Sequence, residues 1–267
     1  MFIFDINLSP MNIFLYFWSF WCLVVTIFVF LFLFIPNLIL IFCLGKFGKK
    51  IFVQYNFYVA NFLLTFYGMR KKITGFFPIK FNDSCIYIIN HKSYLDVIIL
   101  ASIIPHKIKY LGKAEVFKWP LFGYLAKHSG QISVNRESKE SRNRGYDEMK
   151  KAIIEGYSII IFPEGGWKNK GDKKSNNPYN LKDDCLLHEF RNGAFRLAIE
   201  TKVPVVPITL LNAQDRFSDI DMLVRFGQIK AHIFNPIDPL EFSDSLTLNR
   251  HCNNIMLEKL QEYRNEN

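Results

Sequence analysis

Charge is almost missing from the start of this chain of 267 residues. Residues 1–45 contain one acidic side chain, Asp5, and neither lysine nor arginine. The formal net charge of the whole chain is +9, so the rest of the chain carries +10. A basic body behind an uncharged, apolar segment favours an anionic surface or anionic substrates as partners. Zinc-finger spacing and the aromatic signature of RNA-binding domains are also missing, which ranks nucleic acid well below membrane lipids as a partner.

Paired cysteines are missing as well. The five cysteines are odd in number, scattered, and without the close spacing of a metal site or a disulfide framework; they are Cys22, Cys43, Cys85, Cys185 and Cys252. This pattern favours reduced, buried thiols in a protein that faces the cytosol. We therefore expect neither disulfides nor a metal bound by these cysteines; separately, no cofactor is predicted.

The longest apolar run covers residues 13–35 and predicts a membrane anchor. As a helix it measures about 34 Å, enough to cross a hydrocarbon core of about 30 Å. A signal peptide is disfavoured, because the run is long, follows no positive charge and precedes no small-residue cleavage site. Two arrangements stay open: the run spans the membrane alone, or Pro36 and Asn37 turn the chain into a helical hairpin that enters one leaflet. Lysines and arginines follow at positions 46–50 and 70–72, so this side, with the catalytic domain, is predicted to be cytoplasmic (the inner membrane in a bacterium).

Between those basic clusters, residues 51–69 read IFVQYNFYVANFLLTFYGM. A narrow polar stripe at helical spacing crosses this otherwise apolar stretch; its members are Gln54, Tyr58, Asn61 and Thr65. The pattern fits either a core helix of the globular domain or an interfacial helix that lies on lipid. We divide the chain into an anchor (1–45), a basic-flanked interfacial helix (46–75) and an α/β domain (76–267).

From about residue 76, short β-rich runs alternate with helical stretches. The predicted strands include CIYIIN, IKYLG, QISVN, SIIIFPE and VPVVPITLL. This alternation predicts an α/β fold with a mostly parallel sheet flanked by helices. Sites gather where the strands of such sheets end. Three strands end in unusual polar residues: Asn90 and His91, Asn135 and Arg136, and residues 163–165. Residues 168–184 are polar and predict a long surface loop.

The stretch CIYIINHKSYLDVIIL, residues 85–100, has two interpretations. Ser93 and Asp96 match a capping box, in which the serine caps a helix and the carboxylate reaches back. A cap needs no imidazole, however, and His91 precedes it. Histidine titrates near neutral pH and can take a proton from a hydroxyl. A carboxylate about one helical turn away can accept its other ring N–H and stabilise the imidazolium.

Four motifs then occur in a fixed order. They are Asn90-His91-x4-Asp96, GQISVNR at 130–136, FPEGG at 162–166 and VPVVPI at 203–208. Together they resemble the signatures of the glycerophospholipid acyltransferases, nearest the 1-acyl-sn-glycerol-3-phosphate (lysophosphatidic acid) acyltransferases. GKAEVFKWPLFG and FRNGAFRLAIE fit their places between the motifs, and the resemblance covers roughly residues 80–210.

The resemblance implies an O-acyltransferase that moves a fatty acyl chain from a thioester, on coenzyme A or acyl carrier protein, to the hydroxyl of a lysophospholipid. It implies that His91 is the general base and that Asp96 orients it. No metal is needed, because a thioester is already activated. The implied partners are membrane lipids, the lysophospholipid acceptor and the acyl donor.

The other motifs imply a site for the acceptor. Arg136 would bind its phosphate through bidentate hydrogen bonds, and Lys113 in LGKAEVF is a second candidate cation. Glu164 and Gly165 would help to shape the acceptor site. Backbone N–H groups near Gly165 and Gly166 are candidates to stabilise negative charge on the thioester oxygen.

The third motif departs from the family at the acceptor site. It runs Glu164-Gly165-Gly166-Trp167-Lys168, where the family usually continues with threonine or serine and often arginine. The acceptor therefore stays open between lysophosphatidic acid and another lysolipid, either a lysophospholipid or an acylated amino-acid lipid.

Two further classes compete with an acyltransferase. A membrane esterase would use Ser93 as its nucleophile, but the G-x-S-x-G elbow is missing. A non-enzymatic lipid-binding protein would need only the anchor and the basic face.

Overall fold

A seven-stranded sheet forms the centre of the molecule, within the residues that the computed structural model describes: 10–76, 84–105, 107–165, 186–218 and 221–266. Its strands are β1 (Met69–Gly75), β2 (Ile86–Ile89), β3 (Ile108–Lys113), β4 (Ile132–Val134), β5 (Ser158–Ile161), β6 (Val205–Leu210) and β7 (Gly227–Ile233). The order is β1-β7-β6-β2-β5-β3-β4. Every neighbouring pair is parallel except β6 with β7.

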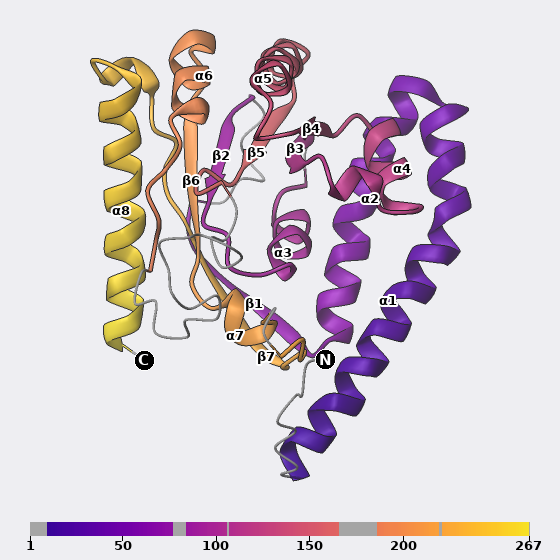
Figure 1. The fold of residues 1–267 in the computed structure, drawn as a ribbon. Coiled ribbons are helices and arrows are strands. Elements are labelled where there is room, and N and C mark those ends of the chain that lie inside the picture. Colours follow the sequence, from indigo (N-terminus) through magenta and orange to yellow (C-terminus); the bar gives the residue numbers. More distant parts are fainter. Residues whose placement is uncertain (1–9, 77–83, 106, 166–185, 219–220, 267) are drawn as a thin grey trace.

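Helices cover both faces of this sheet. They are α1 (Pro10–Phe42), α2 (Gly45–Phe66), α3 (Leu95–Ile103), α4 (Phe122–His128), α5 (Lys139–Ile154), α6 (Gly193–Thr201), α7 (Ala213–Arg216) and α8 (Ser245–Glu266), with 3-10 turns η2 (Val116–Lys118) and η3 (Pro239–Glu241). α5, α6 and α8 pack on one face, and α2 and α3 on the other (Figure 1). The predicted α/β fold with a mostly parallel sheet is confirmed.

The central strands are buried because their sequences are continuous apolar runs. Every residue of β2, β5 and β6 is buried, as expected of strands that are covered on both faces. Along β2, Ile86 and Ile88 pack toward α6 and α8, while Tyr87 and Ile89 pack toward α2 and α3, in keeping with the two-residue period of a strand. β2 thus carries the chain through the core and places His91 at its carboxyl end.

The sheet begins earlier than the sequence predicts. Residues 69–75 are predicted as the end of the interfacial segment, but they form β1, an edge strand that pairs in parallel with β7. The side chains of Arg70, Lys71 and Lys72 are exposed. Charged side chains on an edge strand discourage pairing with other chains. Because three such residues follow one another, the sequence lacks the alternation of apolar residues from which a strand is predicted.

The N-terminal helix does not turn at Pro36 and Asn37. α1 continues through Pro36 to Phe42, because a proline inside an apolar helix removes one backbone hydrogen bond without ending the helix when neighbouring groups compensate. The chain reverses at residues 43–44 instead, where Gly45 has a φ of +51° that suits glycine. α2 then returns alongside α1 (Figure 1). α1 is long and apolar enough to cross a membrane by length and composition, so it is a candidate membrane anchor.

α2 is buried along one face and exposed along another. Ala60, Leu63 and Leu64 are buried against the domain, whereas Tyr58 and Phe62 are exposed. The helix is therefore a core helix along one face and has an apolar outer face.

Both halves of α1 contact the α/β domain. Near its start, the Ser19 hydroxyl oxygen accepts a hydrogen bond from the Val224 backbone N–H at 2.8 Å. Trp18 stacks on Phe66 of α2 with ring centroids 6.5 Å apart. Near its end, α1 makes aromatic contacts with α4. α1 and the domain therefore form one packed unit.

Candidate active site

The polar ends of β2 and β5 lie side by side, because these strands are neighbours in the sheet. Asn90 fixes the end of β2. Its side chain donates to the Leu210 carbonyl at 2.9 Å and accepts from the Leu210 N–H at 2.8 Å, so it continues the pairing of β2 with β6 beyond the last ladder residue. This reciprocal bond holds the backbone immediately before His91.

His91 and Asp96 are in direct contact. The distance from His91 Nδ1 to Asp96 Oδ2 is 2.8 Å. The histidine side chain is 18% exposed and the aspartate side chain 1%. The His91 ring also stacks on Phe162 with centroids 4.0 Å apart. With a carboxylate accepting at Nδ1, the tautomer that carries its hydrogen there is favoured, which leaves Nε2 as the basic nitrogen.

Asp96, in the first turn of α3, is bonded both to the backbone before the helix and to His91. Its Oδ2 also accepts from the backbone N–H groups of Lys92 and Ser93, each at 3.0 Å. Burial raises the pKa of the Asp96 carboxyl, while the hydrogen bonds from His91, Ser93 and Lys92 oppose that rise. The two interpretations of residues 85–100 are therefore combined in one carboxylate, since the turn that begins α3 also points Asp96 at the imidazole.

Ser93 has a structural environment. It is fully buried, its hydroxyl donates to the Phe217 carbonyl at 2.6 Å, and its oxygen accepts from the Leu95 N–H at 3.1 Å. The hydroxyl proton is thus directed to a carbonyl oxygen, which disfavours Ser93 as an esterase nucleophile.

Glu164 links three segments at the site. Its Oε1 accepts from the His91 backbone N–H at 2.9 Å, and its Oε2 accepts from the His188 backbone N–H at 3.0 Å. The residue is 3% exposed. The carboxylate therefore holds the end of β2 and the segment before α6 at fixed positions beside the end of β5.

Gly165 occupies a tight corner after Glu164. Its φ is +82°, and a Cβ there would lie 2.4 Å from Arg191 Nε, so only glycine suits this position. Its N–H donates to the Phe162 carbonyl at 3.1 Å. That N–H is engaged within its own turn, which argues against it as an oxyanion donor. Gly166, Trp167, Lys168 and the predicted loop at 168–184 lie outside the described residues.

Two arginines meet at this corner. Arg136, which follows β4, donates from Nη1 to the Gly165 carbonyl. Arg191 donates its backbone N–H to the Pro163 carbonyl at 2.9 Å and lays its side chain against Gly165. Burial lowers the pKa of the Arg136 guanidinium, and the positive charge of Arg191 lowers it further. Two guanidinium groups so placed favour an anion between or beside them.

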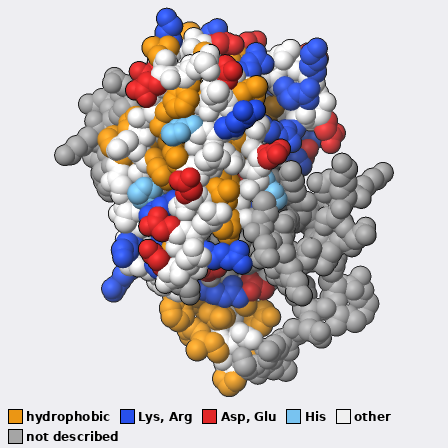
Figure 2. Space-filling view, turned by 90° about the vertical axis from the view of Figure 1, so that its left-hand side faces the viewer, with side chains coloured by type: hydrophobic (Ala, Val, Ile, Leu, Met, Phe, Trp, Pro, Cys, Tyr) orange, Lys and Arg blue, Asp and Glu red, His pale blue; other side chains and the backbone are white. Residues whose placement is uncertain are grey.

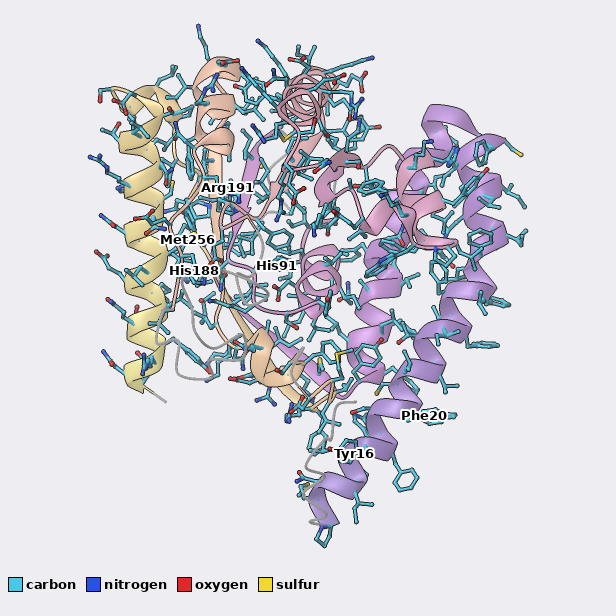
Figure 3. All side chains as sticks on the ribbon, in the orientation of Figure 1. Tyr16, Phe20, His91, His188, Arg191 and Met256 are labelled. Atoms are coloured by element: carbon cyan, nitrogen blue, oxygen red, sulfur yellow. The ribbon has the colours of Figure 1, made fainter. Side chains whose placement is uncertain are left out.

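Arg191 is a candidate that the sequence analysis missed. It lies two positions before α6, in FRNGAFRLAIE (residues 190–200), a stretch that includes most of α6. This stretch matches the family in its place but is not predicted as part of the site. Figure 3 shows His91 beside α3, with His188 and Arg191 on the α8 side of it. The sequence signal that could have identified Arg191 is a basic residue just before a predicted helix, in a stretch that matches the family.

Lys113, the second cation predicted from the sequence, pairs with a neighbouring carboxylate at the surface. It ends β3, is exposed, and forms an ion pair with Glu115 at 3.7 Å. Glu115 in turn raises the pKa of Arg136 by its negative charge, so Lys113 is connected to the arginines through that carboxylate. Among the described residues, no three potential metal-ligating side chains gather in one place, and the arginines are the charged groups that the site offers to a ligand.

A histidine–carboxylate pair lies at the strand ends of a mostly parallel α/β sheet, beside two arginines, and these groups are chemically suited to proton transfer next to an anion. The family model described as Acyltransferase matches residues 66–211, more than half of the chain. The chain belongs to this Acyltransferase family.

Several curated relatives have the same printed function. The chain is 27% identical over 162 residues to a 1-acyl-sn-glycerol-3-phosphate acyltransferase of Chlamydomonas reinhardtii, covering 60% of this chain and 44% of that protein. It is 26% identical to the enzyme of that name from Haemophilus influenzae, covering 66% and 68% of the two chains, and 23% identical to the human beta form, covering 72% and 65%. The chain spans less than half the length of several of these relatives, including the algal one and that of Cocos nucifera, at 46%.

A solved structure has the same fold. The 1-acyl-sn-glycerophosphate (LPA) acyltransferase PlsC from Thermotoga maritima superposes with a TM-score of 0.72, covering 95% of this chain and 96% of that one. At 17% sequence identity this likeness shows the fold alone.

Proposed function

We propose that this protein is an O-acyltransferase that moves a fatty acyl chain from a thioester to the free hydroxyl of a lysophospholipid, with lysophosphatidic acid as the acceptor. The observation that carries the proposal is the contact of His91 Nδ1 with Asp96 Oδ2 at 2.8 Å, where β2 ends. The printed names of the curated relatives support the acceptor.

The proposed reaction follows from the protonation states that this pair favours. Nε2 of His91 takes the proton from the acceptor hydroxyl, and the alkoxide oxygen attacks the thioester carbonyl carbon. The carbon–sulfur bond then breaks, and the imidazolium returns its proton to the leaving thiolate. Asp96 stabilises the imidazolium in between, as carboxylates do in related general-base pairs. The products are the diacyl lipid and the free thiol of the donor.

Arg136 and Arg191 are the proposed site for the acceptor phosphate. A phosphate monoester offers several oxygens to two guanidinium forks, and its charge offsets the mutual repulsion of the two arginines. Glu164 and Gly165 shape this site: Glu164 fixes the backbone of His91, and Gly165 leaves room for Arg191. Lys113 is paired with Glu115, whose charge also acts on Arg136.

We propose that α1 and α2 anchor the protein from one leaflet, with the α/β domain on the cytoplasmic side. α1 contacts the domain near both of its ends, so an upright span would draw charged parts of the domain into the hydrocarbon at considerable cost. The face that carries α8, opposite α1, shows lysines, arginines and carboxylates intermixed (Figure 2). Lipid therefore meets the α1 side and water the α8 side. Because lysolipid and product both reside in the bilayer, this placement brings the site to its substrate.

The decisive experiment is an acyl-transfer assay in lipid vesicles with a panel of lysolipids and both thioester donors, acyl-CoA and acyl carrier protein. We expect product from lysophosphatidic acid, and a loss of about 10²–10⁴ in kcat for His91→Ala with folding intact. His251→Ala, at an exposed position of α8, is the matched control and should retain full activity.

Two outcomes would contradict this function. Full activity of His91→Ala would exclude the general-base mechanism, and a complete lack of transfer by the wild-type chain would favour a lipid-binding protein. Ser93→Ala should keep substantial kcat per folded molecule, whereas an esterase would lose all of it. The panel also decides between lysophosphatidic acid and another lysolipid.

A further inference from the structure

Four large apolar side chains are exposed within one short segment of the α/β domain. Residues 119–124, here called the 119–124 turn, join η2 to the start of α4. Trp119, Leu121, Phe122 and Tyr124 are 50%, 41%, 43% and 47% exposed. Single exposed apolar residues are common on protein surfaces, but contiguous ones mark an interaction site.

The backbone of the turn holds these side chains outward. The Phe122 N–H donates to the Pro120 carbonyl at 2.6 Å, and Leu121 between them has φ +60° and ψ −56°. This is the strained form of the γ-turn, which is rare for a residue with a side chain. Gly123 then lets the chain fold closely onto η2, since a Cβ there would lie 2.2 Å from the Phe117 carbonyl oxygen. An unfavourable conformation is thus retained where it exposes a leucine.

The turn is continuous with the apolar surface of α1. Phe122 lies 6.5 Å from Phe30, and Tyr124 lies 6.3 Å from Phe42, measured between ring centroids. Figure 1 shows α4 beside the end of the α1–α2 pair. Exposed lysines flank the turn at Lys118 and Lys127. Aromatic side chains between basic residues are typical of the interface between headgroups and acyl chains.

We propose that the 119–124 turn is a second membrane-contacting element, which inserts Trp119, Leu121 and Phe122 into the same leaflet as α1. The proposal rests on the one-leaflet placement described above. Its partner is a lipid surface rather than a protein, because the turn extends the lipid-facing side of α1 and its flanking lysines match anionic headgroups. With α1 at one side and the turn at another, the α/β domain contacts the bilayer at two places, which fixes its rotation about the α1 axis.

The test measures the depth of three positions in vesicles of phosphatidylcholine and phosphatidylglycerol. Single cysteines are placed by Leu121→Cys in the turn, Phe28→Cys on α1 (65% exposed) and Ile154→Cys on α5 (78% exposed). The background carries Cys43→Ser and Cys185→Ser, while Cys22, Cys85 and Cys252 are buried. Each cysteine carries an environment-sensitive fluorophore, and its quenching is compared between nitroxide on lipid acyl chains and iodide in water.

We expect the labels at 121 and 28 to be quenched by the lipid nitroxide and the label at 154 by iodide. If position 28 reports lipid while position 121 behaves like position 154, this inference is wrong and the one-leaflet anchor stands. If position 28 reports water as well, the anchor and the inference both fail.

A second variant excludes an artefact of the label. Leu121→Gly removes the side chain and also relieves the positive φ. We expect its Tm in detergent to be unchanged or higher, while its transfer activity falls several-fold on lysolipid in vesicles and stays at the wild-type level on lysolipid in detergent micelles. A merely structural turn would show equal activity in both, and that result would overturn the proposal.

Discussion

At the scale of single residues, the least expected feature is the pair of arginines at Gly165. Arg136 and Arg191 come from different segments and carry like charges at one corner. The two like charges repel each other, and burial together with the positive charge of Arg191 lowers the pKa of the Arg136 guanidinium. Such an arrangement is favourable once an anion neutralises it, and the substrate phosphate is the anion that the proposed reaction supplies.

Arg191→Ala should therefore raise KM for a phosphate-bearing lysolipid and leave kcat nearly unchanged. A hydrogen bond to a charged group contributes about 1.5–3 kcal/mol, which corresponds to a rise in KM of roughly 10- to 150-fold. Arg196→Ala, on an exposed arginine of α6 that pairs with Glu200, is the matched control. Steady-state kinetics separate the two constants, and an unchanged KM would remove Arg191 from the acceptor site.

The sequence predicts site residues where they are close in the chain or follow a predicted strand. His91 and Asp96 are five positions apart, and the beginning of a helix between them brings them to 2.8 Å. Arg136 and Glu164 could be proposed because each follows a predicted strand. Arg191 follows no strand, and its position depends on the path of the chain between β5 and α6, which no local pattern encodes. Lys113, predicted as a second cation of the site, also ends a strand, but its exposed side chain pairs with Glu115.

At the scale of elements, the strands and helices of the domain follow apolar periodicity closely, and the exceptions have physical causes. The sequence does not predict β1. Three consecutive residues of this strand are basic, and an edge strand buries too few side chains to show apolar alternation. Of the two arrangements left open for the N-terminal run, a turn at Pro36 is not observed, because proline is a weaker helix breaker inside an apolar helix than in water. α7 is four residues long, too short for any period to be recognised.

The Glu164 carboxylate joins the end of β2 to the segment before α6. Glu164→Gln should destabilise the fold by about 2 kcal/mol, because one of the two N–H donors would face an NH₂ group and lose its acceptor. Since one of those donors is the backbone of His91, kcat should fall as well. Thermal unfolding and transfer assays measure the two effects, with Glu137→Gln at an exposed position as the control. Wild-type Tm and kcat in Glu164→Gln would show that the link between β2, β5 and the segment before α6 is dispensable.

At the scale of the whole molecule, the question is how a helix long enough to span a bilayer is placed when both its halves contact one domain. Ser19 is bonded to Val224 near one end, and Phe42 packs on Tyr124 and His128 at the other. An upright span would separate these two contacts by the thickness of the membrane. One of them would then lie beyond the hydrocarbon, together with the charged surface around it, which the bilayer strongly disfavours.

Both ends of α1 should therefore be reachable from the same side of the membrane. Met11→Cys places a thiol near the first end, where the native side chain is 62% exposed, and the exposed Cys43 marks the other. In a Cys185→Ser background, a membrane-impermeant maleimide should label both thiols in inverted vesicles of a bacterial expression host and neither in intact spheroplasts. Detergent-solubilised protein, in which both should react, controls for local access. Labelling of Met11→Cys from the outer side alone would mean that α1 crosses the bilayer, and the contacts of α1 with the domain would then have to open in the membrane-bound protein.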